Sequence, residues 1–213
     1  MQNGSDSTAK HSPYGSNYDN FARFISYFYQ IDLVRSLKPK NLLEVGIGNK
    51  TVSNYLKDRN MAVTTCDIDS GLNPDYIADI RKLPFEDNSY DVVMACEIIE
   101  HLPWDQLDEI LTELHRVTSK YVLISVPYLS IYFELAIKFP MFNKIFNKPC
   151  IDLFFRVPFV RFKKFSKSHC WEIGTRGCSL KRLRSQMENH FQIEKEVRPI
   201  LNPKHYFFVL TKI

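Results

Sequence analysis

The sequence predicts an α/β domain in which helices cover both faces of a doubly wound, mostly parallel sheet. Short apolar segments alternate with segments of helical periodicity along most of the chain, and this is the pattern of β-α units stacked on a parallel sheet. The length of 213 residues and the 45% hydrophobic content suit one globular domain with a sizeable core. No apolar run approaches the roughly 18 residues that a membrane-spanning helix needs.

The strands are predicted from short runs rich in aliphatic and β-branched residues. In chain order they cover residues 41–45, 62–66, 76–78, 90–95 and 121–126, and two closing strands follow at 192–197 and 205–211. Helices are predicted at 18–36, 51–59 and 104–117. The last of these has apolar residues at helical spacing, namely Leu107, Ile110, Leu111, Leu114 and Val117.

Two segments do not follow this alternation of strands and helices. Residues 1–17 are rich in Ser, Asn and Gly, so we expect a disordered lead-in before a single domain at 18–213. Residues 128–168 hold nine Phe among repeated Lys and Arg, with prolines at 140, 149 and 158. This composition is interpreted as an insertion of short helices that forms a lid.

The cysteines and the charges limit the class of protein further. The five cysteines are scattered and form no C-x-x-C pair, which favours free thiols in a reducing cytoplasm over a disulfide framework. The net charge of +4 is unevenly distributed. Between Lys138 and Arg184 there are twelve Lys or Arg and two acidic residues, so the rest of the chain is net acidic. Such asymmetry indicates a basic face for an anionic ligand.

A cofactor site is predicted where the first two strands end. The first strand leads into Glu44-Val45-Gly46-Ile47-Gly48, and the glycines let the backbone approach a ligand closely. A carboxylate beside this loop would repel a pyrophosphate, whereas it suits the ammonium and sulfonium groups of S-adenosylmethionine. Asp67 ends the second strand, where a carboxylate can accept both hydroxyls of a ribose.

A longer series of motifs follows these residues. Residues 79–93 read DIRKLPFEDNSYDVV, and residues 96–102 read CEIIEHL. With the preceding glycine loop, they resemble the class I methyltransferases of the methyltransferase type 11 group over about residues 42–127. In that group E-x-G-x-G, an aspartate after the second strand, D-x-x-x-L-P-F-x-D-x-S-F-D-V-V and E-H-L occur in this order.

The resemblance implies a seven-stranded, mostly parallel sheet whose last strand is antiparallel, and an enzyme that uses S-adenosylmethionine and releases S-adenosylhomocysteine. It also implies the residues that contact this cofactor. Glu44, Gly46 and Gly48 would line the methionine end, Asp67 would hold the ribose, Asp79 and Ile80 would contact the adenine, and the Cys96 carbonyl would accept from the methionine ammonium. Ile68, next to Asp67, is also expected to contact the cofactor. Lys50 stands where the group often has a third glycine, and its side chain is expected to point away from the cationic cofactor.

Catalysis is expected to depend on alignment, because the sulfonium methyl group is already activated. A sugar hydroxyl acceptor would also need a base or a metal ion. His169, His101 and Glu97 are the candidate catalytic residues. His169 is the preferred base, because Glu172 follows three residues later and could orient its ring. The alternative for both histidines is a purely structural role in capping or packing.

A metal-free site is the main prediction, with Glu97, Glu100 and His101 as an alternative metal site. Glu97-x-x-Glu100-His101 resembles the E-x-x-E-H segment of magnesium-dependent small-RNA 2′-O-methyltransferases and of quinone-biosynthesis O-methyltransferases. Two carboxylates and an imidazole can hold a divalent ion that lowers the pKa of a hydroxyl. In this alternative the acceptor is an RNA.

The basic, Phe-rich stretch 133–165 allows three interpretations of the partner. It can bind single-stranded nucleic acid, lie on an anionic membrane as a peripheral contact, or form a lid over the substrate. Phe favours burial or membrane contact over base stacking, so nucleic acid ranks below a small-molecule or glycan acceptor that is anionic, such as a nucleotide- or lipid-linked sugar. A cofactor-fold binding module without activity is the contrasting class, and the complete set of Glu44, Asp67 and Asp79 argues against it.

Overall fold

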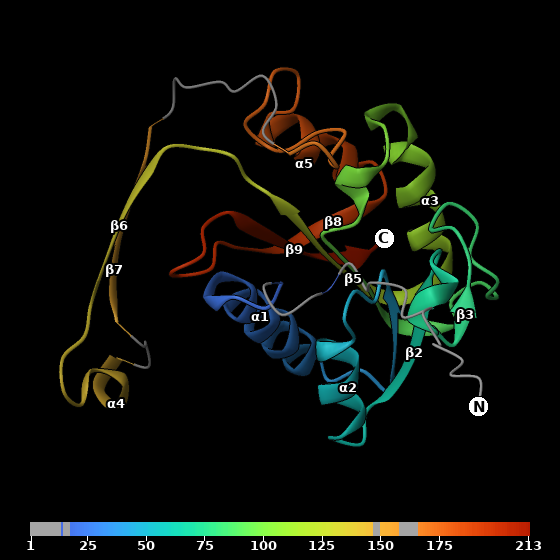
Figure 1. The fold of residues 1–213 in the computed structure, drawn as a ribbon, viewed down its shortest axis with the longest axis horizontal. Helices are drawn as coiled ribbons and strands as arrows, with labels where there is room; N and C mark the ends of the chain where they lie inside the picture. Colours follow the sequence, from blue (N-terminus) through green and yellow to red (C-terminus); the bar gives the residue numbers. More distant parts are fainter. Residues whose placement is uncertain (1–13, 15–17, 147–149, 158–165) are drawn as a thin grey trace, which may run out of the picture.

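A computed structural model describes Tyr14 and residues 18–146, 150–157 and 166–213. The predicted disordered lead-in therefore lies outside the described residues, apart from Tyr14. Most of the described chain forms one central sheet with helices on both of its faces (Figure 1).

The central sheet has seven strands in the order β3-β2-β1-β4-β5-β9-β8. The strands are β1 (Asn41–Val45), β2 (Ala62–Asp67), β3 (Tyr76–Ile77), β4 (Tyr90–Cys96), β5 (Thr118–Pro127), β8 (Phe191–Val197) and β9 (His205–Lys212). β9 pairs antiparallel with both β5 and β8, and the pairings among the first five strands are parallel. This is the doubly wound, seven-stranded sheet expected for a class I methyltransferase, and that prediction is confirmed.

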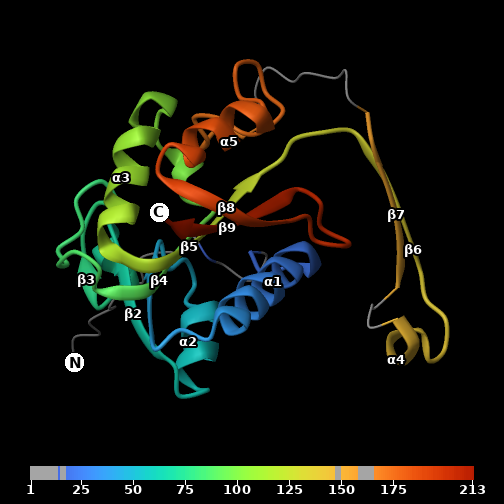
Figure 2. The same cartoon turned by 180° about the vertical axis from the view of Figure 1, so that it is seen from behind.

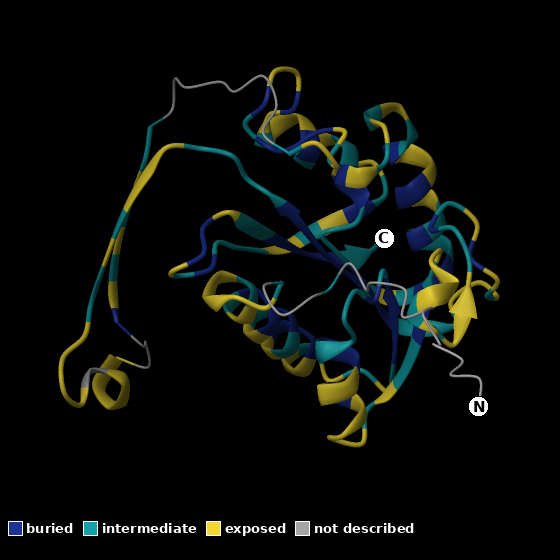
Figure 3. Ribbon diagram, in the orientation of Figure 1, coloured by how far each residue is buried: buried dark blue, intermediate teal, exposed yellow. Residues whose placement is uncertain are grey.

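Alternate side chains of the strands form two separate cores. Leu42 and Met94 belong to the core beneath α1 (Phe21–Leu37) and α2 (Thr51–Lys57), and their chain neighbours Leu43 and Ala95 belong to the core beneath α3 (Leu107–Val117) and α5 (Leu180–Glu188). Because successive side chains of a strand point to opposite faces, runs with no polar residue are needed to fill both cores. Figure 3 shows these central strands as almost continuously buried.

The helices begin and end where local chemistry predicts. The Asn20 side chain accepts from the Arg23 N–H at the start of α1, and Ser179 does the same for the Arg182 N–H at the start of α5. The predicted helix at 104–117 is split into a 3₁₀ turn η3 (Trp104–Gln106) and α3, and two further 3₁₀ turns are η1 (Ser70–Leu72) and η2 (Ile99–His101). α5 was not predicted, because its sequence LKRLRSQME buries only Leu183 and Met187.

The insertion differs from its prediction. In the described part it is mainly a two-stranded antiparallel ribbon of β6 (Tyr132–Ile137) and β7 (Ile151–Arg156), with the short helix α4 (Phe142–Phe146) near the ribbon's far end. Figure 2 shows the ribbon projecting from the body. The prediction of a helical insertion was wrong for these strands, because Phe, Leu and Ile recur there at every second position, which is the period of a strand. Residues 147–149 and 158–165 of the predicted lid lie outside the described part.

The ribbon has two chemically different faces. Three cross-strand pairs, Phe133↔Phe155, Leu135↔Leu153 and Ile137↔Ile151, are in register on one face, and five of these six side chains are exposed. The opposite face carries Glu134 and Asp152, and Arg198 from the segment after β8 forms ion pairs with both. No helix in the described part of the chain is both long and apolar enough to cross a membrane.

Candidate functional site

A cavity of about 620 Å³ lies at the carboxyl ends of β1, β2 and β4. Parallel α/β sheets bind ligands at this edge because the strand order reverses there and neighbouring loops separate. The cavity collects all eight residues that were predicted to contact the cofactor, which are Glu44, Gly46, Gly48, Asp67, Ile68, Asp79, Ile80 and Cys96.

The loop after β1 requires glycine at Gly46. Its φ is +79°, and a Cβ atom at this position would lie 2.0 Å from Cδ1 of Ile98. Gly48 has φ of +50°, and among the described residues a Cβ there would meet only Tyr14, at 3.9 Å; its backbone lines the cavity. Lys50 takes the left-handed φ of +64° without a glycine. Its ammonium group donates to the Asn73 carbonyl at 2.9 Å, and it therefore points away from the cavity, as predicted.

Glu44 is a buried carboxyl group at the bottom of the cavity. Its exposed fraction is 5%, and its Oε2 atom has no hydrogen-bond partner among the described residues. Burial raises the pKa of this carboxyl to about 8, and Ser53 and Lys57 oppose the increase. A buried, unpartnered oxygen of this kind is stabilised by a ligand that brings a positive charge or a donor.

Asp67 holds the glycine loop as well as facing the cavity. Its Oδ2 accepts from the Ile47 N–H at 2.8 Å, and its Oδ1 accepts from the Asp69 N–H at 2.9 Å. Each carboxylate oxygen retains further acceptor capacity. The side chain of Ile68 is 70% exposed beside it, which leaves an apolar surface free for a ring system.

Asp79 has a strong partner in Arg81. Both of its carboxylate oxygens accept from the Arg81 guanidinium, and these hydrogen bonds hold the pKa of Asp79 below its usual value. Arg81 also donates to Gln106, so the pair is fixed at the rim of the cavity. Asp79 is thus ionised and can accept further donors.

The residues after β4 turn towards a second cavity. Glu97 has φ of +58°. Its Oε1 accepts from the Ser125 hydroxyl at 2.9 Å, and its Oε2 lies 3.5 Å from Nε2 of His205. Cys96, in contrast, is half-buried, and desolvation of its thiol raises the pKa well above the usual value. Cys96 is therefore a neutral thiol and unsuited to act as a nucleophile.

The second cavity, of about 560 Å³, adjoins the first. Five residues line both cavities, and these are Tyr14, Tyr18, Arg23, Glu97 and His101. The second cavity adds His169, Glu172, Lys204 and His205. A ligand in the first cavity and a ligand in the second would therefore meet near Glu97 and His101.

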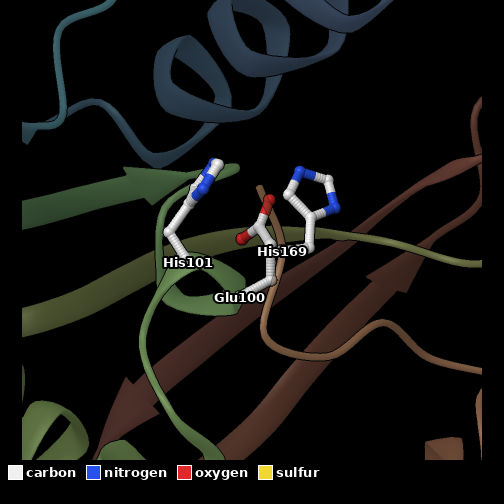
Figure 4. Close-up of side chains that lie close together, drawn as sticks. All are labelled: Glu100, His101 and His169. Carbon is white, nitrogen blue, oxygen red and sulfur yellow. The ribbon is translucent and has the colours of Figure 1, made fainter. Parts of the chain in front are cut away.

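Three side chains between these cavities lie close together (Figure 4). Glu100 has an exposed fraction of 0%, and burial next to Glu97 raises its pKa well above the usual value. The rings of His101 and His169 have centroids 4.7 Å apart and stand edge to face. Nδ1 of His169 donates to Oε1 of Glu172 at 2.7 Å, which is the orienting contact expected from their spacing.

The predicted catalytic residues thus lie together, although the sequence missed part of the site. Arg23, Tyr14, Tyr18 and His205 line the second cavity and were not predicted as site residues. Burial lowers the pKa of His205, which keeps its imidazole neutral near pH 7. The signal that could have found it is its place in the Asn202-Pro203-Lys204-His205 stretch, which also resembles a subset of the methyltransferase type 11 group.

Comparisons with known proteins agree with this fold. Residues 43–124 match the family model described as "Methyltransferase domain". The fold is similar to that of the PH0226 protein from Pyrococcus horikoshii OT3, with 16% identity, a TM-score of 0.61, and coverage of 94% of this chain and 95% of that one. No curated protein matches the sequence.

Two similar structures contain a bound product of the cofactor. Magnesium protoporphyrin IX methyltransferase from Synechocystis PCC 6803, with bound SAH, shares 13% identity and a TM-score of 0.58, over 94% of this chain and 90% of that chain. The 1,6-didemethyltoxoflavin-N1-methyltransferase from Burkholderia thailandensis, with bound 1,6-didemethyltoxoflavin and S-adenosylhomocysteine, shares 14% identity and a TM-score of 0.54, over 90% and 77%.

The sheet topology, the cavity at its carboxyl edge and the family match define a class I methyltransferase. The match at residues 43–124 lies within this fold, and the chain is an S-adenosylmethionine-dependent methyltransferase.

Proposed function

We propose that the enzyme methylates an oxygen atom of a small anionic or sugar-type acceptor, such as a nucleotide- or lipid-linked glycan, which binds in the second cavity. The observation that supports this proposal most directly is a pair of cationic side chains in that cavity, whose two carboxylates, Glu97 and Glu172, already contact protein groups. Arg23 and Lys204 line it, and within the described residues neither side chain forms an ion pair. Unpaired cations that face a cavity favour an anionic ligand.

The first cavity fits S-adenosylmethionine, which supplies the activated methyl group. The unpartnered Oε2 of Glu44 would accept from the ammonium of its methionine part, together with the carbonyl of Cys96. Asp67 would accept from the ribose hydroxyls, and the exposed side chain of Ile68 would lie against the adenine. Asp79 and the backbone of Ile80 would contact the polar edge of the adenine.

The acceptor oxygen displaces the thioether, so that an O–C bond forms as the S–C bond breaks, and the hydroxyl proton has to leave. His101 and Glu97 line both cavities, and His169 lines the acceptor cavity. We assign to His169, supported by Glu172, the main part in orienting or deprotonating the acceptor. Glu97 and His101 hold the acceptor atom near the transferred methyl group.

This function is tested with labelled S-adenosylmethionine and a panel of acceptors. The panel contains nucleotide sugars, polyprenyl-phosphate-linked glycans and a short RNA with a free 3′ end. We expect label to be transferred to a sugar-type acceptor. Transfer to RNA alone would replace this proposal with the RNA alternative.

With the active acceptor, His169→Ala should lower kcat by about 10²–10⁴-fold while the affinity for S-adenosylhomocysteine stays nearly unchanged. His115→Ala is the matched control, because His115 lies on α3 and its Nε2 contacts the Ile213 carbonyl. Wild-type turnover in His169→Ala, with lowered thermal stability, would show that His169 is only structural.

The ribbon of β6 and β7 is proposed as a peripheral contact with an anionic membrane, in an enzyme that is predicted to be cytoplasmic. Its apolar face has Leu135 and Leu153 at the centre, and the segment that joins β6 to β7 carries the exposed Lys138 and Lys144. Apolar side chains can enter the lipid interface while lysines contact the headgroups. Such a contact would place a lipid-linked acceptor close to the enzyme.

Flotation with vesicles of phosphatidylglycerol and phosphatidylcholine tests the membrane contact. Wild-type protein should float with these vesicles. The double variant Leu135→Ser/Leu153→Ser should remain in the soluble fraction, and Phe24→Ser, which changes an exposed side chain of α1, should float like wild type. Equal flotation of all three proteins would refute a contact through the ribbon.

A further inference from the structure

Glu100 is the most unusual acidic residue of the molecule. Its side chain is completely buried, yet neither carboxylate oxygen has a hydrogen-bond partner among the described residues. A buried polar group without a partner costs free energy, and buried carboxylates are therefore normally paired or bound to a metal ion. The structure thus leaves Glu100 with two acceptor oxygens that a ligand can use.

The two imidazoles beside Glu100 each form a hydrogen bond through Nδ1, which leaves Nε2 for a ligand. Nδ1 of His101 donates to the Ser168 carbonyl at 3.0 Å, and Nδ1 of His169 donates to Glu172 at 2.7 Å. Because Nδ1 carries the proton in both rings, Nε2 of each neutral ring has a free lone pair. An imidazole whose other nitrogen donates to a carbonyl or carboxylate is the usual arrangement of a metal-binding histidine.

The positions of these atoms suit a single ion. One ligand atom from each of Glu100, His101 and His169 can be chosen so that all three lie within 4.8 Å of one another. Ligands about 2.1 Å from a tetrahedral ion are about 3.4 Å apart, so small side-chain rotations would complete the site. Glu97 is not part of this group, because its carboxylate contacts Ser125 and His205.

We propose that Glu100, His101 and His169 bind one divalent transition-metal ion between the two cavities. The alternative metal site predicted from the sequence consisted of Glu97, Glu100 and His101. In the site proposed here, His169 takes the place of Glu97. Two imidazoles and one carboxylate favour Zn²⁺, Mn²⁺ or Fe²⁺ over Mg²⁺, which prefers oxygen ligands. Three protein ligands leave at least one position for a further ligand.

The role of this ion follows from the proposed function and depends on it. His101 lines both cavities and His169 lines the acceptor cavity, so the open position would face the acceptor oxygen. A hydroxyl bound to a divalent ion has a lowered pKa. The ion would thus help to prepare the acceptor, whereas ion binding itself needs neither the acceptor nor the cofactor.

The test is titration of the full-length protein, stripped with EDTA, with Mn²⁺ and separately with Zn²⁺. Calorimetry measures the affinity, and the electron paramagnetic resonance signal of Mn²⁺ reports its immobilisation. We expect wild type to bind one ion with a micromolar or lower Kd and a rise in Tm. Glu100→Gln and His169→Ala should each weaken binding by at least about 10–100-fold.

His190→Ala is the control, because the His190 imidazole contacts Asp108 of α3 and lines neither cavity, and it should bind the ion like wild type. If Glu100→Gln does not fold, His169→Ala alone carries the test, because the His169 side chain is 19% exposed. Binding that is unchanged in the variants, or no binding by wild type at millimolar ion, would overturn the proposal. Methyl transfer that proceeds without any ion would leave the proposed function standing and remove only this role of the ion.

Discussion

Glu44 makes cofactor binding depend on pH in a direction that the structure determines. Burial raises the pKa of its carboxyl from 4.5 to about 8 in the protein without ligand. The ammonium of S-adenosylhomocysteine favours the ionised form, so binding near pH 7 has to release a proton. Affinity should therefore rise with pH and level off above pH 8.

The magnitude follows from the ionised fraction. The apparent affinity for S-adenosylhomocysteine is the intrinsic affinity multiplied by the fraction of protein in which Glu44 is ionised. With a pKa of about 8, half of the Glu44 carboxyls are ionised at pH 8 and about one in a hundred at pH 6. The Kd for S-adenosylhomocysteine should thus be about fifty-fold weaker at pH 6 than at pH 8.

Calorimetric titration at pH 6, 7 and 8, in buffers of different ionisation enthalpy, measures both the affinity and the protons released. Glu44→Gln should bind with nearly the same Kd at pH 6 and pH 8 and release no proton, and any remaining pH dependence belongs to other groups. A wild-type Kd that does not change between pH 6 and pH 8, without proton release, would refute this role of Glu44.

The same group should affect stability without ligand. Because the folded-state pKa of Glu44 lies above its unfolded value, the protonated carboxyl stabilises the fold below pH 4.5, and this contribution is lost as the pH rises towards 8. Over this pH range the Tm measured by thermal unfolding should therefore decrease less in Glu44→Gln than in wild type. Asp67→Ala should weaken S-adenosylhomocysteine binding by about 1–3 kcal/mol, as measured by calorimetry. Asp69→Ala should not weaken it, because the Asp69 carboxylate accepts from the Gly71 N–H in η1. Gly46→Ala should lower Tm and abolish binding, because its Cβ would overlap Ile98. Adding Ile98→Ala should recover part of the Tm but not all, since the positive φ remains strained; full recovery would show that the backbone there relaxes freely.

The central sheet could be predicted from the sequence because its signals are local. The central residues of β1, β4 and β5 are buried on both faces and mostly apolar, and short turns separate them from the helices. The ends were less exact, since β5 begins at Thr118 instead of residue 121. There the Thr118 hydroxyl donates to the Tyr121 carbonyl, a contact that the apolar pattern alone does not indicate.

The ribbon could not be predicted in the same way. Each of its strands has only three apolar residues at alternate positions, in runs of six residues, and the lysines and arginines of the surrounding segment favoured a helical interpretation. The contact that fixes its polar face joins Glu134 and Asp152 to Arg198, which follows 46 residues after Asp152. No local pattern identifies such a partner, because the pairing depends on how the chain returns after β8.

The residues that line the second cavity are brought together by the directions of the strands in the sheet. Carboxyl ends of parallel strands meet at one edge of the sheet, and this places Glu97 and His101 after β4. β9 runs in the opposite direction, so its first residue lies at the same edge, where His205 is paired with Pro127 of β5. A histidine at the start of the antiparallel strand therefore belongs to the site whenever the sheet has this topology. Once the resemblance implied an antiparallel last strand, His205 was predictable; Arg23 of α1 was not, because its approach to the cavity depends on how a helix packs and not on the order of the strands.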